Sequence, residues 1–140
     1  MGTKKKLLSI ITVVKNDAIN IEKTINSIIS QKNHDIEYLI IDGKSSDGTL
    51  QRAQKFRYKI DRIISSKDSG IYDAMNIGIK NSSGKYIGFC NSGDILKKNS
   101  LKIITKYLKK DIDVLFATVK RNYLGATIIK SGFNLNRLNY

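Results

Sequence analysis

Each of the first four apolar runs of this sequence ends in, or is followed by, polar side chains that can bind a charged ligand. Asp94, for example, comes shortly after the run at 85–91. A carboxylate with oxygen-donor neighbours suits a hard divalent cation such as Mg²⁺ or Mn²⁺, which usually bridges to substrate phosphates. A metal on Asp94 therefore predicts a phosphorylated ligand. The polar residues of the four runs are Thr12, Lys15, Asn16 and Asp17, then Asp42, Ser45 and Asp47, then Lys67 and Asp68, and finally Asn91, Ser92 and Asp94.

Several familiar sites are excluded by the residues that are present. The first run is followed by Lys15-Asn16-Asp17, with no glycine, so a dinucleotide-binding fingerprint is absent, and no phosphate-binding P-loop motif occurs. Asp42-Gly43-Lys44 lacks the second acid that a haloacid-dehalogenase nucleophile motif needs. His34 and Cys90 are the only histidine and cysteine, which excludes a disulfide, a Cys/His zinc site and a histidine-based triad within this chain. We expect Cys90 to be a small buried hydrophobe.

The elements that must position these residues alternate between strands and helices. Short apolar runs predict strands at 7–14, 36–42, 60–65, 85–91 and 113–119. Helical spacing of apolar residues predicts helices at 18–31, 48–57, 71–80 and about 100–108, with caps at Ser46 or Asp47 for the second and at Asn99 or Ser100 for the fourth. This alternation predicts an α/β fold with a mainly parallel sheet covered by helices on both faces. Ligands of such sheets bind beyond the carboxyl ends of the strands.

Length and composition indicate one folded domain. The chain has 140 residues, of which 41% are hydrophobic and 26% charged, and it contains no repeat or linker. We expect a single domain over 1–140, with a basic arm at 1–6 and an incomplete segment at 120–140 that includes a hairpin around Leu124-Gly125. No apolar run reaches the length of a membrane span and no signal peptide is apparent, so we expect a cytoplasmic protein.

The net charge of +13 indicates an anionic partner. The lysines form short clusters at element ends and no aromatic-interleaved basic stripe, so a basic nucleic-acid-binding domain is the weaker alternative and we expect no nucleic acid. Surface lysines are also attracted to acidic lipids, so peripheral association with an anionic membrane, at its inner face for a cytoplasmic protein, is the other expectation from charge.

Four segments together carry a resemblance to a known family. SIITVVKN at 9–16, IEYLIIDGKSSDGT at 36–49, DSGIYDAMNIGI at 68–79 and GKYIGFCNSGD at 84–94 resemble, in order, motifs of family 2 glycosyltransferases. The resemblance covers roughly residues 7–118. It implies the Rossmann-like GT-A fold of nucleotide-diphospho-sugar transferases, and specifically its N-terminal, nucleotide-sugar-binding half, with the acceptor half truncated.

The resemblance also implies a role for individual residues. Asp42 matches the carboxylate that accepts a hydrogen bond from the base, usually from uracil, and Asp17 matches an acid that closes over the base or ribose. Asp94 matches the metal-binding carboxylate of the DXD motif, whose first acidic position is Gly93 here, which removes one contact to ribose or metal. The donor-binding residues that the resemblance implies are Thr12, Val14, Asp17, Asp42, Asp68, Asn76, Asn91 and Ser92, and the metal residue is Asp94.

The implied reaction is inverting transfer of a sugar from a nucleotide-diphospho-sugar, UDP-linked by the family pattern, to a saccharide or lipid-linked acceptor in surface polysaccharide synthesis. Such a displacement needs a general base, which the family places after the region matching residue 118. No Asp or Glu occurs from Leu115 onward, so the base is not expected within this chain. A catalytically incomplete nucleotide-sugar-binding fragment is the alternative. An incomplete sheet edge would then favour a homo-oligomer.

Overall fold

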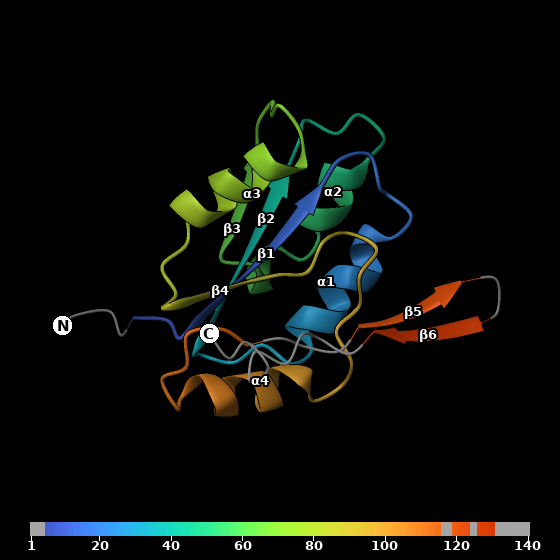
Figure 1. The fold of residues 1–140 in the computed structure, drawn as a ribbon. Coiled ribbons are helices and arrows are strands. Elements are labelled where there is room, and N and C mark those ends of the chain that lie inside the picture. The colour runs from blue at the N-terminus through green and yellow to red at the C-terminus, as the bar shows by residue number, and fades with distance from the viewer. Residues whose placement is uncertain (1–4, 116–118, 124–125, 131–140) are drawn as a thin grey trace, which may run out of the picture.

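The computed structural model describes residues 5–115, 119–123 and 126–130. Four parallel strands form its main sheet in the order β3-β2-β1-β4. These strands are β1 (Leu8–Val14), β2 (Ile36–Asp42), β3 (Arg62–Ser65) and β4 (Tyr86–Phe89). The helices between and after them are α1 (Ile21–Ile29), α2 (Thr49–Gln54), the 3₁₀ turn η1 (Arg57–Lys59), α3 (Ile71–Lys80) and α4 (Ser100–Leu108). The α/β class and the parallel sheet are as the sequence predicts (Figure 1).

Helices cover both faces of this sheet, and every residue of its central strands β1 and β2 is therefore buried. Alternate side chains of a strand point to opposite faces, so a strand that is buried throughout has a cover on each side. Ile10 and Ile40 belong to a core shared with α1, α2 and α4, whereas Ile11 and Ile41 belong to a core shared with α3. Figure 1 shows α3 on one side of the sheet and α1 with α2 on the other.

The α3 helix lies close to the sheet because it carries a glycine where it crosses β1. A Cβ atom at Gly78 would lie 2.6 Å from Cγ2 of Ile11 and 3.3 Å from Cγ1 of Ile41. Ala74, one turn earlier, is also buried. The small residues of this helix therefore set its distance from the strands that lead to the predicted site.

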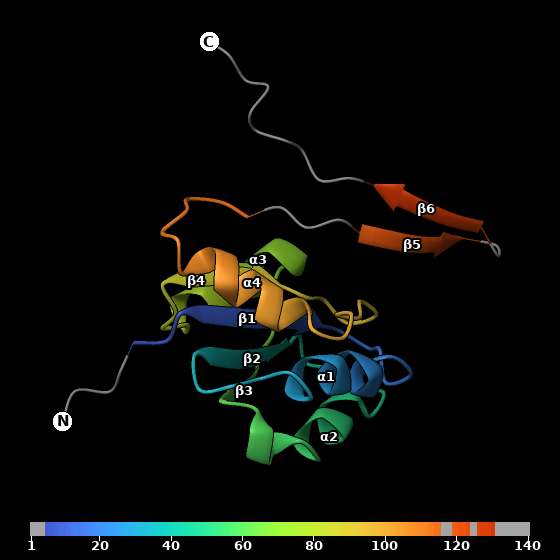
Figure 2. The same ribbon diagram turned by 90° about the horizontal axis from the view of Figure 1, so that it is seen from below.

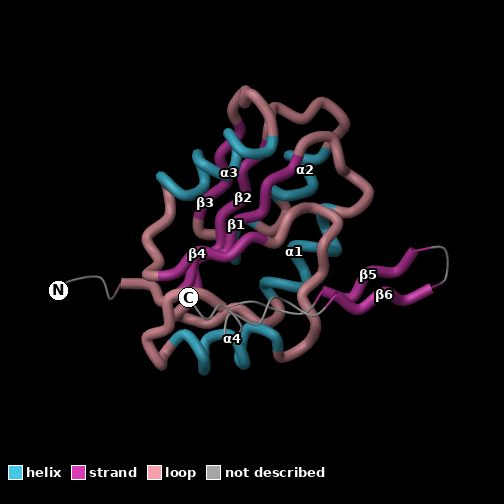
Figure 3. The backbone as a smooth tube through the Cα atoms, in the orientation of Figure 1, coloured by secondary structure: helices cyan, strands magenta, loops and turns pink. Residues whose placement is uncertain are grey.

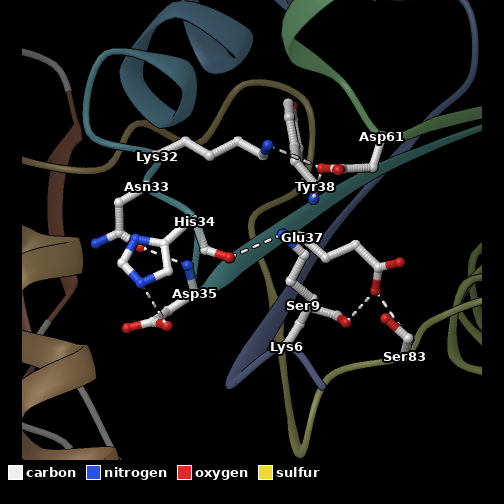
Figure 4. A network of polar contacts seen from close by, with 10 residues as sticks. All are labelled: Lys6, Ser9, Lys32, Asn33, His34, Asp35, Glu37, Tyr38, Asp61 and Ser83. Atoms are coloured by element: carbon white, nitrogen blue, oxygen red, sulfur yellow. Dashed lines mark hydrogen bonds and ion pairs between the residues drawn. The ribbon is translucent and has the colours of Figure 1, made fainter. Parts of the chain in front are cut away.

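The buried carboxylate of Glu37 links several elements at the edge of the sheet where the strands begin, which we call the amino edge (Figure 4). Glu37 is 5% exposed and accepts hydrogen bonds from the hydroxyl of Ser9 and from the backbone N–H of Ser83 at 2.8 Å. The Ser9 hydroxyl in turn accepts one from Gly84 N–H at 2.8 Å. These hydrogen bonds hold the starts of β1 and β2 against the turn before β4.

The prediction of a fifth strand at 113–119 is wrong. Residues 113–115 are not in a strand, and 116–118 lie outside the described residues. Val119 instead opens β5 (Val119–Tyr123), which pairs antiparallel with β6 (Ala126–Lys130) in a separate two-stranded sheet (Figure 2). A hairpin around Leu124-Gly125 fits this pairing, although those two residues lie outside the described part. A hairpin forms between residues that are close in the sequence. Here the hairpin includes Val119, the last residue of the strand predicted at 113–119.

The first two helices are shorter than the periodicity predicts, whereas α3 and α4 have the predicted bounds. The α1 helix begins at Ile21 rather than 18, since the preceding residues form a turn. The α2 helix is capped at Gly48, in a left-handed conformation, and α4 at Asn99, and neither has a side-chain capping bond. Asp47 does accept a hydrogen bond from Thr49 N–H at 3.0 Å. None of the helices in the described ranges is long and apolar enough to cross a membrane.

Candidate functional site

The loops after β1, β2 and β3 leave the sheet at the same edge, which we call the carboxyl edge (Figure 3). The register places Val14 beside Asp42 and Asp42 beside Ser65, so the three strands end level with one another. The loop after β4 joins them, since Ser92 N–H donates to Val13 O at 3.2 Å. Polar groups that are far apart in the sequence therefore meet here, as the sequence predicts for a parallel sheet.

Asp17 and Ser92 link the loop after β1 to the loop after β4. The Ser92 hydroxyl donates to Oδ2 of Asp17 at 2.6 Å, and Asn20 Nδ2 donates to Oδ1 at 2.8 Å. A Cβ atom at Gly93 would lie 4.0 Å from the same Asp17 Oδ2. The Asp17 carboxylate therefore stands beside Gly93, the position that the resemblance matches to an acid of the family.

Asp42 is a buried carboxylate at the end of the second strand. It is 1% exposed, and its Oδ2 accepts hydrogen bonds from the Ser65 hydroxyl at 2.7 Å and from Ser45 N–H at 3.2 Å. From the described residues, its Oδ1 receives only a long contact of 3.4 Å from Ser45 N–H. Donors thus compensate the burial of this charge on one oxygen, and the second oxygen retains acceptor capacity.

Gly43 lets a second carboxylate approach the end of β2. A Cβ atom at this position would lie 2.5 Å from Oδ2 of Asp68 and 3.3 Å from Cδ of Lys15. Asp68 also accepts a hydrogen bond from Gly70 N–H at 3.1 Å, at the start of α3. The absence of a side chain at Gly43 therefore brings an acid from the β3 loop and a lysine from the β1 loop to one place.

Further contacts hold the β1 and β2 loops in fixed positions. Asn16 N–H donates to the Ser45 hydroxyl at 2.8 Å, and Ala18 N–H donates to Oδ2 of Asp47 at 3.0 Å. The hydrogen bond from the Thr49 hydroxyl, together with that from Ala18 N–H, lowers the pKa of Asp47 below its usual value. The two loops form one frame, so a ligand held by one of them is also oriented by the other.

Asp94, the predicted metal residue, is exposed, and its loop is held by Thr24 of α1. The Thr24 hydroxyl donates to Asp94 O at 2.9 Å and accepts from Gly93 N–H at 3.0 Å. No hydrogen bond to the Asp94 carboxylate comes from the residues that the structure describes. The side-chain oxygen of Asn91, three residues earlier, is buried and likewise has no partner among them. Unpaired buried acceptors are rare in folded proteins, so Asn91 is a distinctive feature of this loop.

These groups fit a divalent cation such as Mg²⁺ that is held jointly by a protein carboxylate and by the phosphates of a ligand. Within the described ranges no three His, Cys, Asp or Glu residues come together as a metal cluster. Mg²⁺ does not need such a cluster, because it is usually held by one or two carboxylates and by the phosphates of its substrate. An exposed Asp94 carboxylate without protein donors agrees with this shared arrangement and not with a metal held by protein ligands alone.

The remaining predicted donor-binding residues lie apart from this group. Thr12 is fully buried, and its hydroxyl donates to Cys90 O at 2.7 Å and lies 3.0 Å from the Tyr38 hydroxyl. Val14 is part of the core shared with α1. Asn76 is exposed in the middle of α3. The structure thus brings together Asp17, Asp42, Asp68, Asn91, Ser92 and Asp94, and it places Thr12 and Val14 beneath them in the core.

A comparison with known families matches nearly the whole chain. The model of glycosyl transferase family 2 matches residues 9–137. The chain belongs to glycosyl transferase family 2. The family assignment made from the four sequence segments is therefore confirmed, and these segments contain Asp42, Asp68, Asn91, Ser92 and Asp94 of the carboxyl edge, whereas Asp17 directly follows the first segment.

Curated family 2 relatives are similar over much of this chain but are longer. TuaG, a glycosyltransferase of Bacillus subtilis, is 34% identical over 105 residues, which are 73% of this chain and 42% of TuaG. Glycosyltransferase AglE of Haloferax volcanii is 37% identical over 94 residues, which are 64% of this chain and 31% of AglE. The chain thus spans less than half the length of these two relatives.

Solved structures confirm the GT-A fold. The 1–349 chain of S. aureus TarS in complex with UDP-GlcNAc superimposes with a TM-score of 0.69 at 25% identity, over 74% of this chain and 31% of that TarS chain. The mannosyltransferase PcManGT of Pyrobaculum calidifontis, solved with GDP-Man and Mn²⁺, gives a TM-score of 0.66 at 20% identity, over 76% and 33% of the two chains. At that identity the second match supports the fold alone.

Two residues of the carboxyl edge in this family 2 chain are not among the predicted donor-binding residues. Ser65 is the hydrogen-bond donor to Asp42, and Lys15 lies against Gly43 beside Asp68. Ser65 is the last residue of β3 and pairs in register with Asp42. Aligning the ends of the predicted strands would therefore have found Ser65. Lys15 is a polar residue of the first run, but no spacing distinguishes it from other exposed lysines.

Proposed function

We propose that this chain binds a nucleotide-diphospho-sugar at the carboxyl edge, as the donor-binding part of an inverting glycosyltransferase. The observation that carries the proposal is Asp42, a buried carboxylate with one oxygen left as an acceptor, at the end of a central strand. This arrangement suits the N–H group of a nucleobase. We propose uracil as the base, which agrees with the UDP-GlcNAc complex of TarS.

The neighbouring residues supply the rest of the proposed donor site. Asp17, fixed by Ser92 and Asn20, faces the ribose side of the ligand. Lys15, which lies against Gly43 at the end of β2, would attract the phosphates. Asp94 would hold a Mn²⁺ or Mg²⁺ ion that is shared with the diphosphate, and such an ion stabilises the negative charge of the leaving group when it is bound.

Charge gives a reason for the proposed metal dependence. Asp17, Asp68 and Asp94 lie at one edge, where a diphosphate would add further negative charge, and like charges within a few ångströms disfavour binding. A divalent cation removes this repulsion. We therefore expect the nucleotide to bind weakly without the metal and more tightly with it.

The proposal for the acceptor is supported by a relative and not by the geometry of the carboxyl edge. We propose a saccharide or lipid-linked acceptor in the synthesis of a surface polysaccharide, in line with the name of TuaG, which assigns it to teichuronic acid biosynthesis. The base that deprotonates the acceptor is not assigned to any residue of this sequence. The proposal for the residues of this sequence is therefore limited to binding of the donor.

Calorimetric titration of UDP, GDP and CDP, with and without Mn²⁺, tests the donor proposal. We expect UDP to bind in a metal-dependent manner. Asp42→Asn and Asp94→Asn should each weaken binding about tenfold or more, since each removes an ionised hydrogen-bond or metal partner. Asp111→Asn is the matched control, because Asp111 is an exposed acid that pairs with Lys85 at the amino edge.

Equal affinity for UDP, GDP and CDP, or unchanged affinity in the Asp42 and Asp94 variants, would contradict the proposed site. Thermal melting of each variant shows that a loss of affinity is not a loss of the fold. Release of UDP from a bound donor, with and without an added acceptor, then separates transfer from binding alone.

A further inference from the structure

The outer face of α4 combines positive charge with exposed apolar side chains. Between 95 and 110 the sequence has six lysines and no Asp or Glu. Leu101, Thr105 and Leu108 face the core, and the other side of the helix is exposed. We call this outer side the α4 surface, and it consists of Lys102, Ile103, Lys106 and Tyr107, together with Lys97 and Lys98 of the preceding loop and Lys110 just beyond the helix.

The positive charge of this surface is mostly uncompensated. Asp35 forms an ion pair with Lys109 at 3.4 Å, and Asp111 pairs with Lys85. The described parts of the chain place no carboxylate within ion-pair distance of the lysines of the α4 surface itself. The charges are thus available to an anionic partner and are not used to hold the fold together.

Apolar side chains stand among these lysines rather than on a separate face. Ile103 is 54% exposed and Tyr107 is 46% exposed, one helical turn apart. The ammonium of Lys110 lies 5.2 Å from the centre of the Tyr107 ring. Helices that lie in a membrane interface have this composition, with lysines for the acidic headgroups and with aliphatic and aromatic side chains that enter the boundary of the acyl chains.

We propose that the α4 surface docks on an anionic lipid bilayer, with Ile103 and Tyr107 inserted at the headgroup level and the lysines around them on acidic lipids. A nucleic acid is the less suitable occupant, because half-exposed Ile103 would gain nothing from a phosphate backbone. No arginine occurs on this surface either. The proposal does not depend on the donor site, since no predicted donor residue lies on α4.

The surface is rigidly connected to the carboxyl edge. Gln31, at the end of α1, accepts a hydrogen bond from Leu101 N–H at 3.2 Å and donates one to Lys97 O at 2.9 Å. Ser27 accepts one from Leu96 N–H at 3.1 Å. A bilayer bound to α4 would therefore hold the Asp94 loop at a fixed orientation to its surface.

Insertion can be tested by fluorescence because the chain contains no tryptophan. Tyr107→Trp should show a blue shift of emission with vesicles of phosphatidylcholine and phosphatidylglycerol, and no shift with phosphatidylcholine alone. Tyr58→Trp is the matched control, since Tyr58 is 77% exposed and also lies near a lysine, Lys59, but on η1. Its emission should not change. A blue shift at position 58 equal to that at 107, or none at either, would overturn the proposal.

Charge-loss variants test the electrostatic part by vesicle co-sedimentation. Lys102→Gln/Lys106→Gln should reduce partitioning onto the anionic vesicles about thirtyfold, since each lysine near an acidic membrane contributes about a factor of five or more. Lys59→Gln/Lys80→Gln removes the same charge from η1 and α3 and should have little effect. Equal losses from the two pairs would show a non-specific charge effect and refute docking through α4. Binding of single-stranded RNA to the same surface, without any vesicle-induced emission shift in the Tyr107→Trp variant, would identify a nucleic acid instead.

Discussion

At the scale of single residues, the reactivity of a side chain in this protein depends on where the fold buries it. Asp42 and Cys90 each lie at or just beyond the end of a strand, and both are almost fully buried. Asp42 is compensated by Ser65 and Ser45, whereas the Cys90 thiol has only a weak 3.8 Å contact to Asp94 O. The carboxylate is thus kept as an acceptor and the thiol is kept unreactive.

The reactivity of Cys90 gives the residue-scale prediction. Burial, with a smaller contribution from the charge of Asp94, raises the pKa of this thiol to about 12. The thiolate is the reactive form, so its fraction at pH 8 falls far below that of an ordinary cysteine and rises only as the pH approaches 12. Ellman's reagent should react at least about a hundredfold more slowly with the native chain than with the chain in urea. Complete reaction within seconds at about pH 8 in the folded chain would contradict this burial.

The position of the polar residues at the carboxyl edge could be predicted from the sequence, but the surroundings of each side chain could not. Asp17, Asp42 and Asp94 could be predicted from their places after the strands, because those places follow from strand order alone. The burial of Thr12 could not be predicted, since its hydroxyl is satisfied by the Cys90 carbonyl, which lies just beyond another strand. A polar residue at a strand end has the same sequence pattern whether it faces a ligand or the core.

At the scale of elements, local periodicity was sufficient for the first four strands and their helices and insufficient for the fifth strand. The runs at 7–14 and 36–42 are mostly apolar, which favours strands covered on both faces, and every residue of the two strands that form there is buried. The run at 113–119 has a similar composition, but Val119 pairs with Lys130 in a hairpin. The choice between a crossover strand and a hairpin depends on distant partners and is not encoded in the run itself.

The close packing of α3 gives the element-scale prediction. In Gly78→Ala the new methyl group would stand 2.6 Å from Cγ2 of Ile11, so the helix must move away from the sheet. We expect a loss of about 1–2 kcal/mol in the free energy of unfolding, after the preference of alanine for helices is taken into account. Urea denaturation measures this loss. Gly88→Ala is the control, since its methyl group would have ordinary contact at 3.6 Å from Leu8 Cδ1. Equal stability of wild type and Gly78→Ala would show that α3 is not held this closely.

At the scale of the whole molecule, charge is divided between two regions. The net charge is +13, yet the carboxyl edge gathers Asp17, Asp42, Asp68 and Asp94, while the lysines of the α4 surface have no acid among them. The acidic edge suits a metal-bridged diphosphate, and the basic helix suits an anionic lipid surface. The overall charge alone indicates an anionic partner but not which region would meet it.

The position of the donor is the central claim, and mapping of backbone amide NMR signals during addition of UDP and Mg²⁺ tests it most directly. At 15.8 kDa the chain is well suited to this measurement. We predict that the amide signals of Gly43, Ser45, Ser92 and Gly93 shift progressively, and that those of Ser83 and Gly84, at the amino edge, do not. Shifts confined to the amino edge or to the α4 surface would contradict a nucleotide site at the carboxyl edge.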